Sequence, residues 1–351
     1  MLKFKSVIAS LLLSTAAGAY AQSPLQFDEN GEFKIVQFTD THFRWDKGDE
    51  KTVTPMMEEV IAAEQPDFII ITGDLIYSTN VEKAVNQLFE PIVNSGIPFA
   101  FVFGNHDHQF ELNRSQIYDI IQNMPGCVMP KRGDAQSPDY VLEVLSSDGS
   151  KPASVFYCLD SHAGAQVKGA GRYAWLTTNQ IVWYKTNSIR YAENNDGQPL
   201  PSLMFFHIPL PEAKEALADK SIYYLGEAGE KVCSPHMNSG MFTAIMEQND
   251  VFACFFGHDH DNDFLIPYYD VLLGYGRYGG SKKAVYNNIG KNGARVIVLK
   301  EGQKELDTWL RLRGEDAEVN KASFPADFKG KKRKSNKKKK KQEEAEETAE
   351  E

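Results

Sequence analysis

Residues 99–107 read FAFVFGNHD: five apolar residues are followed directly by glycine, asparagine, histidine and aspartate. A short apolar run that ends at turn-forming residues predicts a strand buried on both faces. The polar residues then lie where the strand leaves its sheet. This stretch therefore predicts a buried strand that leads into a polar loop.

The same arrangement occurs four more times along the chain. The other stretches are FKIVQFTDTH at 33–42, FIIITGD at 68–74, LMFFH at 203–207 and VFACFFGHDH at 251–260. In α/β sheets the carboxyl ends of the strands collect at one edge, where ligands bind, so we expect the five polar clusters to converge. Gly73, Gly104 and Gly257 would allow a sharp exit from the strand and a close backbone approach.

Helical segments alternate with these strands, as in layered α/β folds. Helices are expected at Thr52–Glu64, Val81–Asn94 and Glu111–Met124, and further strands at Ser154–Leu159 and Val296–Leu299. The first helix is expected to bury one face, made of Val53, Met56, Met57, Val60 and Ile61. Phe27 to Pro325 contains no repeat and no linker, which favours a single domain of residues 22–327.

The residues that follow the strands are of types that bind metal ions. The candidate ligands are Asp40, His42, Asp74, Asn105, His207, His258 and His260. Any one of these clusters is a weak signal, but five of them in order at strand ends form a coherent set. Carboxylate, imidazole and amide ligands suit Mn, Fe, Zn or Ni, whereas a set of thiolates would indicate structural zinc.

The series DTH, GD, GNHD, H and GHDH resembles the signature of calcineurin-like metallophosphoesterases, and the resemblance extends from Phe33 to Leu312. Segments 175–183, 238–240 and 257–264 resemble the purple-acid-phosphatase-like branch. The resemblance implies an α/β fold of four layers, the α/β/β/α metallophosphoesterase sandwich. It also implies a dinuclear metal centre that hydrolyses phosphate esters through a metal-bridging hydroxide.

The resemblance also implies a role for each motif residue. Asp40, His42 and His260 would hold one ion, while Asn105, His207 and His258 would hold the second. Asp74 would bridge the two ions. His106 would contact the phosphate and assist the leaving group, and Asp107 beside it could orient the imidazole ring.

Tyr77 lies in the sequence GDLIY, which is similar to the GDxxY pattern that supplies an iron-binding tyrosinate in purple acid phosphatases. Those enzymes generally carry DxG at the first motif, where this chain has His42. Tyr77 is therefore a metal ligand, a donor behind the ligands, or a core tyrosine.

Five other residues are candidates for substrate contact, with an exposed loop position as the alternative for each. They are His108, His162, Arg172, Tyr275 and Arg277. Arginine suits phosphate oxygens and tyrosine suits flat leaving groups.

The first 21 residues have the pattern of a secretory signal: Lys3 and Lys5, an apolar core, and Ala19-Tyr20-Ala21 as the cleavage site. The alternative, a retained membrane helix, needs about 20 apolar residues, and this core is shorter. No later segment is long and apolar enough to span a bilayer. We therefore expect an exported protein, periplasmic or secreted, without a membrane span. Its four cysteines lack CxxC spacing, and buried free thiols are expected at Cys158 and Cys254.

Residues 328–351 change character, with a lysine-rich block followed by a glutamate-rich one, and predict a solvated, disordered tail. The alternative is binding of nucleic acid through the lysines. The net charge of −10 argues against a nucleic-acid-coating protein.

Hydrolysis of a small phosphorylated substrate is the expected function, with a phosphomonoester favoured. The alternatives are a phosphodiesterase or nucleotide hydrolase of the same superfamily and a non-catalytic protein that binds metal or phosphate. The sequence does not indicate an oligomeric state.

Overall fold

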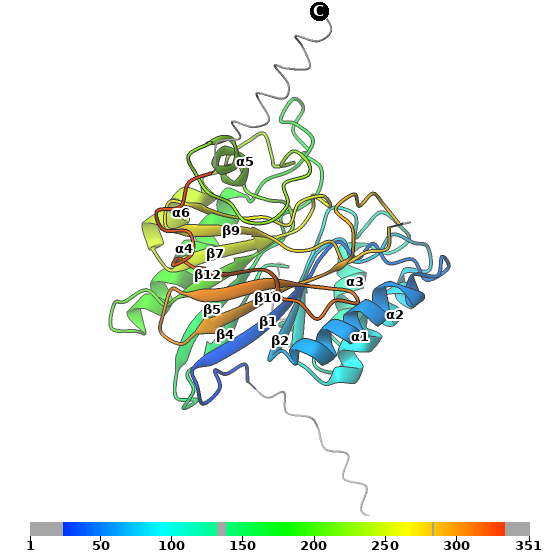
Figure 1. Cartoon of the computed structure of the whole chain (residues 1–351), viewed down its shortest axis with the longest axis horizontal. Helices are drawn as coiled ribbons and strands as arrows, with labels where there is room; N and C mark the ends of the chain where they lie inside the picture. Colours follow the sequence, from blue (N-terminus) through cyan, green and yellow to red (C-terminus); the bar gives the residue numbers. More distant parts are fainter. Residues whose placement is uncertain (1–23, 132–137, 283, 334–351) are drawn as a thin grey trace, which may run out of the picture.

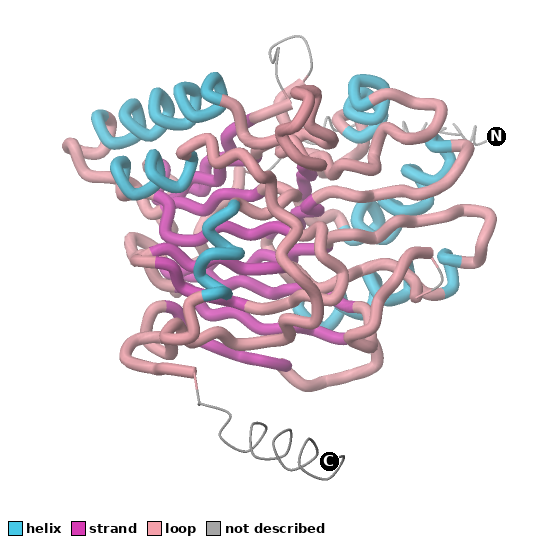
Figure 2. Tube along the Cα trace, turned by 90° about the horizontal axis from the view of Figure 1, so that it is seen from above, coloured by secondary structure: helices cyan, strands magenta, loops and turns pink. Residues whose placement is uncertain are grey.

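The structure is a computed structural model that describes residues 24–131, 138–282 and 284–333. The expected signal segment 1–21 lies outside these residues, as does the tail from residue 334 onward. Two six-stranded sheets face each other, and helices cover their outer faces (Figures 1 and 2). The expected four-layer α/β/β/α sandwich is confirmed.

The first sheet has the strand order β12-β11-β10-β1-β2-β3. Its strands are β1 (Glu32–Phe38), β2 (Phe68–Thr72), β3 (Phe99–Val102), β10 (Gly293–Lys300), β11 (Leu306–Leu312) and β12 (Val319–Phe324). β1, β2 and β3 pair in parallel, whereas β10, β11 and β12 pair antiparallel, with β10 against β1. The three strands that carry candidate ligands therefore point the same way and end at one edge.

The second sheet has the order β4-β5-β6-β7-β9-β8. Its strands are β4 (Tyr140–Leu145), β5 (Pro152–Cys158), β6 (Ser202–Phe205), β7 (Val251–Phe256), β8 (Leu265–Tyr268) and β9 (Val271–Tyr275). β5, β6, β7 and β9 are parallel. The candidate ligands thus come from both sheets, because β6 and β7 belong to the second sheet.

Helices α1 (Val53–Glu64), α2 (Val81–Ser95) and α3 (Arg114–Ile121) cover the first sheet, and α4 (Thr178–Glu193), α5 (Pro211–Ala218) and α6 (Met241–Gln248) cover the second (Figure 1). A short 3-10 helix, η1 (Asp49–Lys51), precedes α1. The expected buried face of α1 is confirmed in full. The third helix begins later than expected because the Asn113 side chain and Gln116 form a capping box that starts it at Arg114.

Aromatic side chains join the two sheets. Phe156 of the second sheet lies 6.0 Å from both Phe33 and Phe68 of the first, measured between ring centroids, and 5.6 Å from Phe205. These rings are almost inaccessible to solvent. Alternate residues of β5 face the other way, toward α4, so both faces of this strand are buried, as its apolar sequence predicts.

The expected domain limit at residue 327 is wrong, because the folded domain extends beyond it. Phe328 is buried and its ring packs against Phe324 and Tyr223. The Arg333 guanidinium lies over the Tyr224 ring. The lysine-rich composition that begins at Lys329 concealed this last turn. At the other end Phe27 is buried in the same core.

All four cysteines are free, and Cys158 and Cys254 are buried, as expected. Among the described residues no helix is long and apolar enough to cross a membrane.

Replacement of Phe156 by alanine tests the junction between the sheets. Removing this ring leaves a cavity among three others, so we expect a loss of about 3–5 kcal/mol in unfolding free energy, and less for Phe156→Leu. Urea unfolding of the metal-free protein measures it, with Val182→Ala on the exposed face of α4 as the control. A loss no larger than that of the control would contradict the assigned packing.

Glu212 at the start of α5 gives a pH-dependent test. Burial raises the pKa of its carboxyl above the ordinary value of 4.5, although a hydrogen bond of 2.7 Å from Asn238 opposes the shift. A group with a raised pKa in the folded state destabilises the fold as the pH rises through its titration range. The stability difference between Glu212→Gln and wild type should therefore move in favour of the variant between about pH 4 and pH 7. A difference that is constant with pH, measured by urea unfolding, would contradict this.

Candidate metal centre

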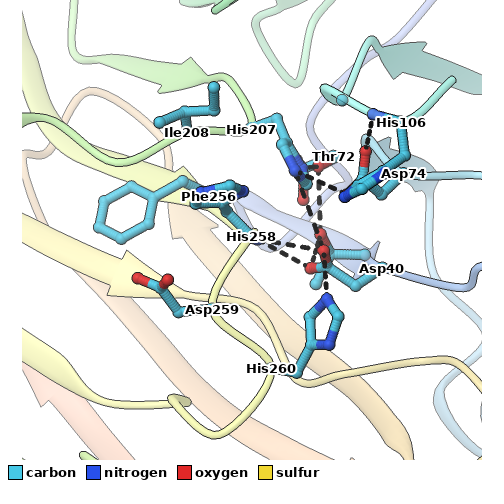
Figure 3. Close-up of polar contacts among 12 residues, drawn as sticks. Asp40, Thr72, Asp74, His106, His207, Ile208, Phe256, His258, Asp259 and His260 are labelled. Carbon is cyan, nitrogen blue, oxygen red and sulfur yellow. Dashed lines mark hydrogen bonds and ion pairs between the residues drawn. The ribbon is translucent and has the colours of Figure 1, made fainter. Parts of the chain in front are cut away.

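The five polar clusters converge, as expected, at the carboxyl ends of β1, β2, β3, β6 and β7 (Figure 3). Backbone hydrogen bonds hold the loops side by side. Asp40 and His42 donate their amides to the carbonyls of Gly73 and Asp74, and Gly257 donates to the carbonyl of His207. The loops after β1 and β2 are thus joined to each other, as are those after β6 and β7.

Asp40, His42 and His260 form the first group of side chains, and all three are buried. The Nε2 atoms of His42 and His260 are 3.1 Å apart. Asp40 Oδ1 lies 3.6 Å from His260 Nε2 and 3.9 Å from His42 Nε2. Three ligand atoms therefore face one small volume, which is the arrangement that holds a metal ion.

Asp74, His207 and His258 form the second group, which is also buried. Asp74 Oδ2 lies 3.2 Å from His207 Nε2 and 3.5 Å from His42 Nε2 of the first group. Its other oxygen accepts a hydrogen bond of 2.8 Å from the His106 amide. Asp74 therefore holds one oxygen between the two groups and uses the other to fix its orientation.

Several buried polar atoms at this place have no hydrogen-bond partner among the described residues. They are Asp74 Oδ2, Asn105 Oδ1, His42 Nδ1, His106 Nδ1, His207 Nε2 and His258 Nε2. Buried polar atoms are normally paired, so a concentration of unpaired ones at a single place indicates a ligand. Nitrogen and oxygen donors of this kind fit a pair of transition-metal ions.

Backbone carbonyls orient two of the imidazoles. His207 Nδ1 lies 2.8 Å from the carbonyl of Thr72, and His260 Nδ1 lies 3.0 Å from that of Tyr286. A hydrogen bond from Nδ1 leaves Nε2 free to bind a metal, which is the usual way in which proteins fix a metal-binding tautomer.

Burial and the close carboxylates shift the ionisation of these groups. Burial lowers the pKa of His42 and of His258 well below the ordinary value. Both rings are therefore uncharged at pH 7, which is the form of imidazole that binds a metal ion. Burial also disfavours charge on His207, but the carboxylates of Asp74 and Asp40 overcome it and raise its pKa to about 10. Burial acts to raise the pKa of Asp74, but the nearby His207 imidazole outweighs burial, so the pKa of Asp74 is lowered. The Asp74 carboxylate and the His207 imidazole thus favour each other's charged form.

Four polar residues of these loops have left-handed backbone conformations: Asp40, His42, Asp74 and His258, with φ between 39° and 82°. Such conformations cost non-glycine residues of order 1–3 kcal/mol each and cluster at functional sites. Close packing of the loops accompanies them. A Cβ atom on Gly104 would collide with Asp74, and one on Gly257 would collide with Thr39 and Asp40.

Asp107 binds backbone groups. Its carboxylate accepts hydrogen bonds from the amides of Gly104 at 2.7 Å, Leu75 at 2.6 Å and Asp74 at 3.1 Å. It therefore fastens the loop after β2 to the loop after β3. The expectation that Asp107 orients the His106 ring stays a prediction, since the contacts that we find for its carboxylate are with the main chain.

Tyr77 borders the site. Its ring makes edge contacts with His42 at 5.9 Å and His106 at 5.8 Å between centroids, and 37% of its surface is exposed. The core alternative for Tyr77 is therefore wrong, and its two other roles remain predictions.

The residues considered for substrate contact separate into two sets. His108 and His162 line one pocket, and Arg172 is exposed beside the Tyr173 ring. Tyr275 and Arg277 were expected to contact the substrate, and this expectation is wrong because both side chains are buried. The Tyr275 hydroxyl donates to Asp259 at 2.5 Å, and Arg277 donates to Asp263 and to backbone carbonyls. Their polar atoms are used inside the protein.

Sequence reasoning missed two aromatic residues that lie against the candidate ligands. The Tyr173 ring lies 4.5 Å from that of His258, and the Tyr286 ring lies 4.5 Å from that of His260. Each comes from a loop whose sequence has no apolar periodicity. Their only signal is an aromatic residue within a glycine- or asparagine-containing loop.

Residues 33–262, which contain all five clusters, match the family model described as calcineurin-like phosphoesterase. The chain is 30% identical, over 86% of its own length and 86% of the other's, to the "Probable inactive purple acid phosphatase 14" of Arabidopsis thaliana. It is 29% identical to Phosphatase DCR2 of Saccharomyces cerevisiae, over 84% of this chain and 56% of that protein. A dimetal phosphatase from Danio rerio has the same fold, with a TM-score of 0.56 and 11% identity over 83% of this chain and 98% of that one.

The extent of the family match, the similarity to named purple acid phosphatases and the shared fold agree with the signature in the sequence. This chain therefore belongs to the calcineurin-like phosphoesterase family and is similar to its purple-acid-phosphatase-like members.

Proposed function

We propose that this protein is a metal-dependent phosphoric ester hydrolase that acts on phosphomonoesters. The observation that carries the proposal is the position of Asp74 Oδ2 between the imidazoles of His42 and His207, within two adjoining groups of buried ligand atoms. The family membership supports the same reaction class.

In this proposal Asp40, His42 and His260 would hold one ion, and His207 and His258, together with Asn105, would hold the other. Asp74 would be shared between the two ions. Asn105 is included among the ligands because its buried Oδ1 atom has no hydrogen-bond partner among the described residues. It offers an amide oxygen, whereas the other ligands are carboxylates and imidazoles.

Two bound ions would activate a water molecule and neutralise charge on the phosphoryl oxygens. His106 would donate a proton to the departing alcohol oxygen, which is general acid catalysis. Its amide hydrogen bond to Asp74 fixes its place relative to the bridging carboxylate. Asp107 would hold Asp74 and the loop that carries His106 in place, because it accepts hydrogen bonds from the amides of Asp74 and Gly104.

Two other functions remain testable. One is hydrolysis of phosphodiesters or nucleotides. The other is non-catalytic binding of metal or phosphate, which gains support from the words "Probable inactive" in the name of the Arabidopsis relative. The candidate ligands and His106 are all present in this chain, which favours catalysis.

We also propose that residues 1–21 are a signal peptide and that the protein is periplasmic or secreted. The charge, apolar core and Ala19-Tyr20-Ala21 sequence support this. The greater part of the expected tail, residues 334–351, lies outside the described part of the chain. Mass determination of the exported protein would show whether its first residue is Gln22.

The reaction is tested by depleting the purified protein of metal and restoring Mn, Fe, Zn or Ni separately. Initial rates are measured with p-nitrophenyl phosphate and bis-p-nitrophenyl phosphate. We expect turnover to depend on added metal and to be faster with the monoester. Faster diester turnover would assign a phosphodiesterase, and two bound ions without turnover on either ester would favour the binding protein.

Asp74→Asn tests the bridging role. Loss of partners behind metal ligands already lowers metal affinity or activity by about 10–100-fold, so loss of the bridging charge should lower kcat/KM by at least about 100-fold. Metal content, measured by elemental analysis, should fall below two ions per chain. The control is Asp270→Asn, which removes an equal charge from the exposed turn before β9. Full metal content and activity in Asp74→Asn would exclude a bridging role.

A further inference from the structure

A pocket of about 630 Å³ lies between the start of α3 and the loop formed by residues 163–174. His108, Arg114, His162, Val167 and Trp175 contribute to its lining. Its volume is within the range of about 300–1,000 Å³ that is typical of small-molecule sites, and it is larger than a phosphate group requires.

The pocket adjoins the candidate metal centre through shared loops. The Arg114 guanidinium, in the pocket wall, donates a hydrogen bond of 2.6 Å to the carbonyl of Gly104, the residue before Asn105. His162 follows β5, which pairs in parallel with the strand that leads to His207. Ser161, next to His162, accepts a hydrogen bond of 2.9 Å from the amide of Ile208.

The same loop touches the metal centre and the pocket. Its two sides are joined by hydrogen bonds from the amide of Ala165 to Arg172 and from the amide of Ala174 to Ala163. Tyr173 on this loop packs its ring against His258, while Ala165 and Val167 line the pocket. A group held in the pocket would therefore lie beside the place where phosphate is expected.

The charges in the described lining compensate each other. Arg114 pairs with Asp160 at 2.5 Å and also donates to the carbonyl of His162 at 3.3 Å. Burial, followed by the nearby guanidinium of Arg114, lowers the pKa of His108, which makes it neutral at pH 7. Such a lining suits an uncharged group better than a second phosphate, which would call for uncompensated cations.

The wall of the pocket offers apolar surface to a ligand. Val167 is 59% exposed, and Trp175 and three alanines of the loop line the same pocket. Burying a flat apolar group against these side chains would remove apolar surface from water, which favours binding.

We propose that this pocket binds the alcohol part of the phosphomonoester and that this part is an uncharged aromatic group; the proposal rests on the hydrolase function proposed above. Water supplies the new oxygen on phosphorus, the bond from phosphorus to the aromatic alcohol's oxygen breaks, and that oxygen takes up a proton. The pocket determines which ester is cleaved, and the metal centre determines how.

The test compares 2-naphthyl phosphate with methyl phosphate in wild type, Ala165→Trp and Trp175→Ala. Each ester is compared across variants, so differences in intrinsic reactivity cancel. We expect Ala165→Trp, which fills the pocket, to lower kcat/KM for the naphthyl ester by about tenfold or more, the value of losing one buried aromatic contact. Trp175→Ala should lower the same parameter, mainly through KM. Methyl phosphate should change by less than about twofold, because it does not reach the pocket.

Val182→Trp, an equivalent enlargement on the exposed face of α4, is the control and should change neither ester. Equal losses for both esters in Ala165→Trp, or none for the naphthyl ester, would overturn the proposal.

Calorimetric titration of the metal-loaded protein separates failure of the pocket from failure of the hydrolase function. The probes are 2-naphthylphosphonate and methylphosphonate, which cannot be hydrolysed. If neither ester is cleaved, tighter binding of the naphthyl probe that is lost in Ala165→Trp would still support the pocket. Equal affinities of wild type for the two probes would overturn it.

Discussion

The burial of two carboxylates and four imidazoles at one place is the constraint on which the rest of this structure depends. Asp40, Asp74, His42, His207, His258 and His260 are each at most 7% exposed. Ionised groups are costly to bury without partners, and like groups at this distance repel each other. A pair of cations would remove both costs, and the loops, the oriented imidazoles and the left-handed backbone hold the candidate ligands where such cations would bind.

Sequence patterns predicted the centre of the fold well because its strands carry an unambiguous signal. β2 and β7 have the bounds that we expected, since each is a fully apolar run that ends at a glycine. The residues after these strands converge because the topology brings parallel strand ends together. The strands β4, β8, β9, β11 and β12 and the three helices α4, α5 and α6 were not predicted, since their patterns are mixed or short.

Other parts of the site depend on contacts between distant segments, which local sequence does not report. Tyr275 and Arg277 were candidates for substrate contact, yet the buried acids Asp259 and Asp263 bind them inside the fold. Tyr173 contacts His258 from a loop whose two sides pair at Gly164 and Tyr173, far from His258 in sequence. Local sequence also gave no sign that the Asp107 carboxylate binds amides contributed by two loops. The last turn before residue 333 was not predicted, because its lysine-rich sequence is typical of an exposed tail.

The division of the ligands between two sheets has a mechanical consequence. Asp40, Asp74 and Asn105 follow strands of the first sheet, whereas His207, His258 and His260 follow strands of the second. Each ligand group of three therefore takes residues from both sheets. A small slide of one sheet over the other would therefore change the distances between ligand atoms that come from different sheets, such as His42 Nε2 and His260 Nε2. The aromatic contacts of Phe156 with Phe33 and Phe68 resist that slide. Packing in the core would therefore help to set the spacing of the ligands, and a metal bound by residues of both sheets would in turn hold the two sheets together.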